Sequence, residues 1–220
     1  NSLYSHIDKF ILLTKQMEER IPLSIGKNLI LEGICTTIPE DNNIRLSNDN
    51  DKTLLYTGSL DNHTCVCDLV DAFMMTKNKD YRLIICGSGE GEGYINKMSK
   101  LDSRIIFRGF LSRNEVLEMQ QGATALINPR KPTIALTKYS FPSKTIEYMV
   151  SGTPLIGYKL DGIPQEYYEH FYSIDGVSNE ALSQMIESVL NKSQEELNMF
   201  AEKARQFILQ NKSSKSQVHR

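Results

Sequence analysis

The feature that most constrains the fold is a regular alternation of apolar runs and helical patterns between residues 53 and 174. Six runs of four to six residues, rich in aliphatic and β-branched side chains, are separated by segments with helical periodicity. Most of the runs lack strict polar alternation, which is typical of strands buried on both faces of a parallel sheet. The runs are TLLYTG (53–58), RLIICG (82–87), RIIFRG (104–109), TALINP (124–129), PLIGY (154–158) and FYSI (171–174).

Helical segments lie between and after these runs. Over 67–77 the apolar residues fall on one stripe of a helix, and a capping box at Ser112 opens a second helix that ends at Gly122. Further helices are predicted over 179–190 and, beyond a cap at Ser193, to about residue 209. Strands that alternate with helices across short turns predict an α/β fold with a doubly wound, Rossmann-like parallel sheet.

The chain divides into five segments by composition. We expect the Rossmann-like domain over 53–192 and a C-terminal helix over 193–210. Residues 1–36 show a strand, a helix and a strand, which we interpret as the remnant of a preceding domain. Residues 37–52 are polar and aperiodic and predict a linker, and the polar residues 211–220 predict a flexible tail.

Charge and cysteine usage exclude several classes of function. A net charge of −2 without a basic stretch does not predict a nucleic-acid partner. No apolar run approaches the ~18 residues that a membrane helix needs. The cysteines lack the spacing of a zinc site, so we expect no metal and a reduced, cytoplasmic protein. They are Cys35, Cys65, Cys67 and Cys86.

Ligands of open α/β sheets bind beyond the carboxyl ends of the strands, so the segments after each run are the candidate sites. After the second run, Gly87 and Gly89 match two glycines of a dinucleotide fingerprint, but Glu92 stands where the third belongs. Two readings remain open, a flexible turn into a helix or a close approach of backbone to a ligand.

The loop NPRKPTIALTKYSFPSK follows the fourth run and gathers basic residues. Arg130, Lys131, Lys138 and Lys144 occur in it without an acidic residue between the first and the last. One reading is a solvated charged face. The other is an anion site, because Ser143 is a predicted N-cap and the helix after it offers free backbone N–H groups to a phosphate.

Glu147 lies in the first turn of that helix, one turn after Lys144. A glutamate there is favoured by the helix dipole alone, by about 0.3–1 kcal/mol. Alternatively, it reaches past the phosphate to sugar hydroxyls, as a ribose-binding carboxylate does. In that reading, Lys144 and Glu147 contact two different parts of one ligand.

Five segments carry a family resemblance and occur in a consistent order. They are LLYTGSL…LVDAF (54–73), LIICGSG (83–89), IIFRGFL (105–111), ALINPR (125–130) and YSFPSKTIEYMVSGTPLIGYKLDGIPQEY (139–167). Together they resemble the carboxy-terminal domain of GT-B glycosyltransferases, more narrowly the retaining "group 1" enzymes of family 4. Enzymes of this kind often build capsular or other surface polysaccharides in bacteria. The resemblance covers about residues 53–200.

The resemblance implies that the chain is the donor-binding half of a GT-B hexosyltransferase. Such an enzyme transfers a sugar, with retention, from a nucleotide-diphosphate sugar to a saccharide or lipid-linked acceptor. It uses no cofactor and no metal. The acceptor would bind through an amino-terminal domain, so the present chain alone would be inactive. A cytoplasmic location follows, with peripheral association at the inner face of the membrane as an option.

Residue by residue, the resemblance implies the following roles. Glu147 matches the second glutamate of the family's E-x7-E motif, which holds the donor ribose, and Tyr139 stands in place of the first. In the family's G-R-L-x3-K-G pattern, Ser59 replaces the arginine and Thr64 the lysine. The implied donor-binding residues are Gly58, Ser59, Gly87, Gly89, Arg108, Phe110, Arg130, Ser140, Phe141, Pro142, Ser143, Lys144 and Glu147. No catalytic residue is assigned.

Because two family cations are replaced, we expect Arg130 and Lys144 to supply the positive charge for the diphosphate. Three alternatives stay open at this stage. A GT-B sugar-nucleotide epimerase shares the architecture, and a non-catalytic nucleotide-sugar-binding or partner subunit would explain the replacements at Ser59, Thr64 and Tyr139. A nicotinamide-dependent oxidoreductase is disfavoured by the broken glycine fingerprint.

Overall fold

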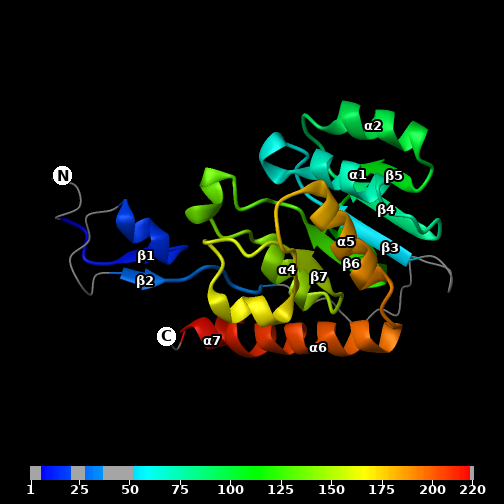
Figure 1. Ribbon diagram of the computed structural model, residues 1–220. Helices are drawn as coiled ribbons and strands as arrows, with labels where there is room; N and C mark the ends of the chain where they lie inside the picture. The colour runs from blue at the N-terminus through cyan, green and yellow to red at the C-terminus, as the bar shows by residue number, and fades with distance from the viewer. Residues whose placement is uncertain (1–5, 21–27, 37–51, 219–220) are drawn as a thin grey trace.

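The computed structural model describes residues 6–20, 28–36 and 52–218. Its main sheet has six parallel strands in the order β5-β4-β3-β6-β7-β8 (Figure 1). All six predicted strands are confirmed. They are β3 (Lys52–Thr57), β4 (Tyr81–Cys86), β5 (Ile105–Gly109), β6 (Ala125–Asn128), β7 (Leu155–Gly157) and β8 (Tyr172–Ser173).

The central strands are buried on both faces, which explains their continuous apolar sequences. Every residue of β3 after Lys52 is buried, and Leu54 and Leu55 pair in register with Leu83 and Ile84 of β4. Alternate side chains of a strand point to opposite faces, so neither face of this strand meets solvent. Burial on both faces requires covering layers of helices.

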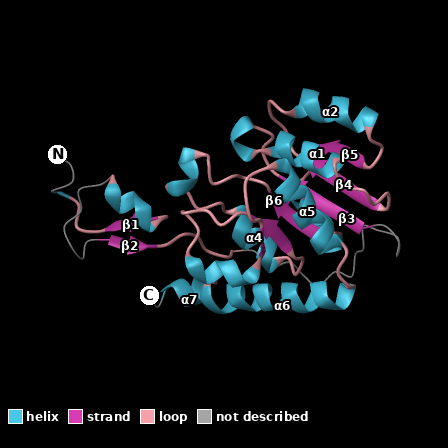
Figure 2. Ribbon diagram, in the orientation of Figure 1, coloured by secondary structure: helices cyan, strands magenta, loops and turns pink. Residues whose placement is uncertain are grey.

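Helices lie on both sides of the sheet (Figure 2). In one layer α1 packs against α2 and α5, and elsewhere α4 packs against α6. The capping box predicted at Ser112 is confirmed, because its hydroxyl accepts from the Glu115 N–H and the Glu115 carboxylate accepts from the Ser112 N–H. The helices are α1 (Val66–Met74), α2 (Glu92–Leu101), α3 (Arg113–Gly122), α4 (Lys144–Val150), α5 (Asn179–Leu190), α6 (Gln194–Asn211) and α7 (Ser214–Val218).

The strand order reverses at β3. The chain continues from β3 to β4 and β5 on one side, and then returns to place β6, β7 and β8 on the other side. The topological switch point therefore lies between β3 and β6. In open α/β sheets this is where the loops at the carboxyl ends diverge and leave a crevice for ligands.

The amino-terminal segment forms a small unit of its own. Strands β1 (Phe10–Leu12) and β2 (Asn28–Ile30) pair in parallel, and a 3-10 helix, η2 (Lys15–Glu19), follows β1. Figure 1 shows this pair to one side of the main sheet. The strand–helix–strand pattern expected before residue 36 is thus present in the described residues. Of the predicted linker over 37–52, residues 37–51 lie outside the described ranges, and Lys52 belongs to β3.

The end of the chain differs from the expected flexible tail. Lys212 is fully buried, and its ammonium forms ion pairs with Glu32 and Glu166. The Lys212 carbonyl accepts from the Cys35 N–H at 2.7 Å, and α7 follows. Polar composition alone suggested mobility here, but the charge of this lysine is used inside the molecule, where it needs partners.

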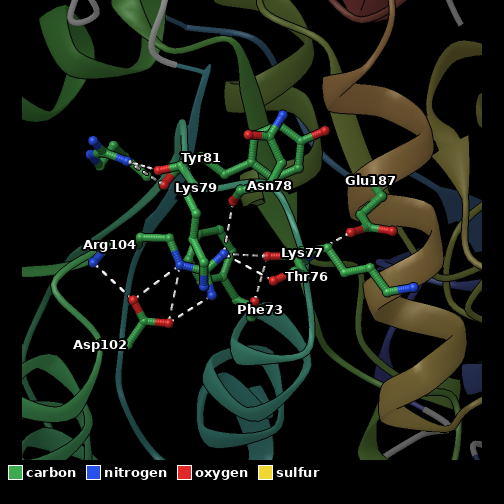
Figure 3. A network of polar contacts seen from close by, with 10 residues as sticks. Phe73, Thr76, Lys77, Asn78, Lys79, Tyr81, Asp102, Arg104 and Glu187 are labelled. Carbon is green, nitrogen blue, oxygen red and sulfur yellow. Dashed lines mark hydrogen bonds and ion pairs between the residues drawn. The ribbon is translucent and has the colours of Figure 1, made fainter.

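A second buried cation lies at the amino-terminal edge of the strands (Figure 3). Arg104, just before β5, is 5% exposed and forms an ion pair with Asp102 at 2.7 Å. Its guanidinium also donates to the carbonyls of Thr76 and Asn78, which follow α1, at 3.0 and 2.9 Å. The Lys77 N–H in turn donates to Glu187 of α5 at 2.7 Å. This network joins α1, β5 and α5.

None of the helices in the described ranges combines the length and the apolar character that crossing a membrane requires.

Candidate functional site

Two adjoining pockets open at the carboxyl ends of the strands, at the switch point. The larger has a volume of about 590 Å³ and lies between the ends of β3, β4 and β5. The smaller, of about 200 Å³, lies between the ends of β3 and β6 and the start of α4. Both are lined by residues 57–59 and by Lys144, so one extended ligand can occupy both. The combined space is within the range of small-molecule sites.

The basic loop divides between this site and other parts of the molecule. Arg130 and Lys144 line the smaller pocket. Lys131 instead pairs with Asp68 at 2.6 Å, and Lys138 pairs with Glu19 at 2.7 Å. Two of the four cations therefore lie where the anion site is predicted, and the other two are paired with carboxylates elsewhere.

The charge of Arg130 is available in the pocket. Among the described residues, its guanidinium has no ion-pair partner. The Lys144 ammonium lies 2.7 Å from Glu147 Oε1. The smaller pocket thus has one unpaired cation and one cation whose single partner lies on the next turn of its own helix.

Glu147 is held as a carboxylate. Burial opposes its ionisation, but hydrogen bonds from Lys144 and Gln120 outweigh this effect and lower its pKa below the ordinary value. Glu147 does not line the two pockets above. It lines a third hollow of about 280 Å³, on whose wall Arg113 and residues 33–36 also lie. Lys144 and Glu147 therefore face adjacent spaces and are joined by their ion pair.

Ser143 stands at the N-cap position of α4, as predicted, but its side chain does not cap the helix. Its backbone is helical, with φ −54° and ψ −29°, and its side chain makes no capping hydrogen bond. An N-cap hydroxyl reaches the N–H groups ahead of it only from an extended backbone. The first turn begins one residue earlier, where the Thr145 N–H donates to the Pro142 carbonyl at 2.8 Å. Ser143 itself is exposed and lines the smaller pocket.

A buried tyrosine fixes α4 to the end of β3. The Tyr148 hydroxyl accepts from the Thr57 N–H at 2.9 Å and donates to the Thr57 carbonyl at 2.8 Å. Burial raises the pKa of this phenol, so it stays protonated and remains a donor. The two walls of the smaller pocket are thereby held at a fixed separation.

The glycines after β4 serve loop packing. A Cβ at Gly87 would lie 1.8 Å from the Gly58 carbonyl oxygen, and one at Gly89 would meet the Leu60 backbone at 3.0 Å. The loops after β3 and β4 are also bonded to each other, since the Leu60 N–H donates to the Ser88 carbonyl at 2.9 Å. The close approach that the sequence indicated is to another loop of this chain, and it forms the floor of the larger pocket.

Most of the remaining predicted residues line the pockets, but Arg108 and Ser140 do not. Phe110 lines the larger pocket and is 81% exposed. Phe141 is buried against Tyr167, with ring centroids 5.4 Å apart. Arg108 is exposed, and neither it nor Ser140 lines any of the three pockets. Ten of the predicted residues line the two pockets at the carboxyl ends of the strands. They are Gly58, Ser59, Gly87, Gly89, Phe110, Arg130, Phe141, Pro142, Ser143 and Lys144.

Two positions that depart from the family pattern have other partners. Ser59 donates its hydroxyl to Asp61, which brings a carboxylate into the lining of the larger pocket. The Tyr139 hydroxyl accepts from Arg20 at 3.2 Å, and the Arg20 guanidinium lies 5.1 Å from the Tyr139 ring. Tyr139 therefore contacts the amino-terminal unit.

Sequence reasoning missed Thr57, Gln120 and Tyr148, which hold the site together. Thr57 and Tyr148 read as ordinary members of a strand and of an apolar helix face. Gln120 lies among polar residues of α3, yet it is fully buried. A glutamine in such a stretch has no local signal that distinguishes it from its exposed neighbours.

The family described as "Glycosyl transferases group 1" matches residues 37–207. No curated protein gives a significant sequence match. Solved structures give similarity of fold at low sequence identity. The chain aligns with TarM of S. aureus, crystallised with fondaparinux, α-GlcNAc-glycerol and UDP, at a TM-score of 0.78 and 15% identity. This alignment covers 98% of the present chain and 43% of TarM.

Two further structures extend the comparison. WaaG, a glycosyltransferase involved in lipopolysaccharide biosynthesis, aligns at a TM-score of 0.70 and 20% identity, over 90% of this chain and 58% of WaaG. The pneumococcal O-GlcNAc transferase GtfA, in complex with UDP and GlcNAc, aligns at 0.67 and 16%, over 96% of this chain and 43% of GtfA. The chain thus spans less than two thirds of each of these proteins. With the family match extending over most of its length, the chain belongs to the glycosyl transferases group 1 family and has its GT-B-like α/β fold.

Proposed function

We propose that this chain is the donor-binding part of a retaining glycosyltransferase that uses a nucleotide-diphosphate sugar. The observation that carries the proposal is the pair of connected pockets at the switch point between β3 and β6, with Arg130 and Lys144 on the wall of the smaller one. Doubly wound sheets bind nucleotides at this place.

The roles of the residues follow from charge and position. Arg130 and Lys144 bind the diphosphate and stabilise the charge that develops on it as the sugar departs. Glu147, ionised beside them, accepts hydrogen bonds from the ribose hydroxyls. The ribose lies at the hollow that Glu147 lines, and the remainder of the donor extends into the larger pocket, where the Phe110 ring is exposed.

The proposal also covers the acceptor, the metal requirement and the cellular location of the reaction. The acceptor is a saccharide or a lipid-linked saccharide that binds through a further domain, and the present chain alone transfers no sugar. The reaction needs no metal and takes place in the cytoplasm or at the inner face of the membrane. A role in bacterial surface polysaccharide synthesis is supported by the family match and by the likeness to WaaG, which acts in lipopolysaccharide biosynthesis.

The double variant Arg130→Ala/Lys144→Ala tests the proposal. Hydrogen bonds to charged groups contribute about 1.5–3 kcal/mol each, so losing two should weaken nucleotide-sugar binding roughly 100-fold or more. The measurement is isothermal titration calorimetry with UDP-glucose, GDP-mannose and ADP-glucose. The matched control is Lys131→Ala/Lys138→Ala, which removes the same charge from the same loop but from lysines paired elsewhere. Equal affinity of both double variants would refute the assignment.

One observation favours a second candidate, a non-catalytic partner subunit. The Asp61 carboxylate lines the larger pocket close to where the family pattern carries an arginine and a lysine, and Ser59 and Thr64 replace them. Thermal-shift screening with the same three nucleotide sugars and with NAD separates the candidates. Stabilisation by a nucleotide sugar supports the donor site, whereas no response to any ligand favours the partner subunit. Stabilisation by NAD alone would exclude both.

A further inference from the structure

Gln120 connects the two walls of the site from a fully buried position. It lies near the end of α3, behind the end of β3 and the start of α4. Its Nε2 donates to Thr57 Oγ1 at 3.2 Å and to Glu147 Oε1 at 2.7 Å. One amide group thus uses both of its protons on the residues that frame the candidate donor site.

The orientation of this amide is fixed by charge. Rotating it by half a turn would place the carbonyl oxygen against the Glu147 carboxylate, and two acceptors repel each other. In the orientation that satisfies Glu147, the Gln120 Oε1 atom is buried and has no hydrogen-bond partner among the described residues. An unpaired buried carbonyl costs stability, which indicates that the residue serves a purpose other than stability.

The consequence for Glu147 is an unequal use of its two oxygens. Oε1 accepts from both Gln120 and Lys144, each at 2.7 Å. Oε2 has no hydrogen-bond partner within the part of the chain that the structure describes. The side chain of Glu147 is 24% exposed and lines the hollow of about 280 Å³, so its unbonded oxygen can accept from a ligand there.

We propose that Gln120 is a positioning residue for the donor: it holds Glu147 by one oxygen and leaves the other available to the ribose hydroxyls of the nucleotide. This inference rests on the proposed function and deepens it. Because Gln120 touches no ligand in this account, it acts only through Glu147 and, by way of the shared oxygen, through Lys144.

The protonation of Glu147 supplies a signature for this role. Its carboxylate interacts with Lys144 on its own helix, with Gln120 on α3 and with the Arg113 charge, also on α3. Removing the Gln120 donor removes one of the interactions that lower the pKa of Glu147. When the Gln120 donor is removed, the loss of donor binding on acidification should therefore begin at a higher pH than in the unaltered chain.

Two substitutions test the inference by calorimetry with the nucleotide sugar that binds the unaltered chain among UDP-glucose, GDP-mannose and ADP-glucose. Gln120→Met keeps the volume and removes the donor, so we expect affinity about tenfold lower, the equivalent of one hydrogen bond to a charged group. Gln120→Glu places a second carboxylate against that of Glu147. The two repel each other until, as pH falls, they share a proton and the contact at position 120 is restored. The affinity of this variant should rise on mild acidification, whereas that of the unaltered chain should not.

Thr153→Val is the matched control. The Thr153 hydroxyl donates to the backbone carbonyl of Gln120 at 2.6 Å, so this near-isosteric change loosens the same residue without altering its side-chain carboxamide. We expect it to lower the melting temperature and leave donor affinity unchanged. Affinity that falls equally in Thr153→Val and Gln120→Met would assign Gln120 a purely structural role.

Glu147→Ala distinguishes failure of this inference from failure of the proposed function. If Glu147→Ala leaves affinity unchanged, the donor site itself is misassigned. If Glu147→Ala weakens binding while Gln120→Met binds normally and Gln120→Glu shows the pH profile of the unaltered chain, only the positioning role is overturned.

Discussion

At the scale of single residues, Gly87 shows how tightly the floor of the site is built. Its φ of +148° is unfavourable for any side chain, and a Cβ would lie 1.8 Å from the Gly58 carbonyl oxygen. Gly87→Ala must therefore separate the loops after β3 and β4. We expect a loss of unfolding free energy of roughly 2–4 kcal/mol together with weaker nucleotide-sugar binding, measured by urea denaturation and calorimetry.

Gly93 provides the control for that substitution. It lies in α2, and a Cβ there would meet nothing within 4 Å. Gly93→Ala should stabilise the protein by about 0.5–1 kcal/mol, because alanine restricts the unfolded chain and favours the helix. A Gly87→Ala protein as stable as the Gly93→Ala protein would contradict the packing described here.

At the scale of elements, the Arg104 network ties α1 to the start of β5 at the edge opposite the pockets (Figure 3). Arg104→Met would leave the carbonyls of Thr76 and Asn78, and the side-chain contacts of Asp102, without the guanidinium donors. The backbone N–H of residue 104 would still donate to Asp102. We expect a loss of roughly 2–4 kcal/mol in unfolding free energy, with nucleotide affinity unchanged, because the site lies at the other ends of the strands. Chemical denaturation beside calorimetry measures both quantities.

The same network predicts a pH dependence. The hydrogen bond from Arg104 is the main cause that lowers the pKa of Asp102. A lowered folded-state pKa stabilises the protein above the unfolded-state pKa, and this contribution disappears as pH falls through the lowered value. Arg104→Met should therefore lose less stability than the unaltered chain between about pH 7 and about pH 3. Equal losses would show that the pair contributes nothing.

Strands and helix ends were predictable from sequence where neighbouring residues alone determine them. A strand buried on both faces is a continuous apolar run, so β3, β4 and β5 could be placed within one or two residues of their bounds. The capping box at Ser112 was predictable for the same reason, because its hydrogen bonds join residues only three positions apart. Ser143 also occupies its predicted N-cap position, but its helical backbone and the turn that begins at Pro142 keep its hydroxyl from capping the helix.

At the scale of the whole molecule, the site depends on partners that are distant in sequence. By sequence alone, nothing distinguishes Lys131 and Lys138 from Arg130 and Lys144. The fold does so by bringing Asp68 and Glu19 beside the first two. Gln120 joins Thr57 and Glu147 across 63 and 27 residues. No window of sequence contains such a relation. The position of the candidate site therefore stays a prediction from the order of the strands, whereas its internal bonding could not be predicted.

The central claim is that a nucleotide sugar binds where β3 and β6 diverge. The most direct test is a crystal structure of the chain with the nucleotide sugar that stabilises it most. We expect the diphosphate within hydrogen-bond distance of Arg130 and Lys144, and a ribose hydroxyl on Glu147 Oε2. A ligand bound at another edge of the sheet, or one that leaves the Lys144–Glu147 pair untouched, would contradict the claim.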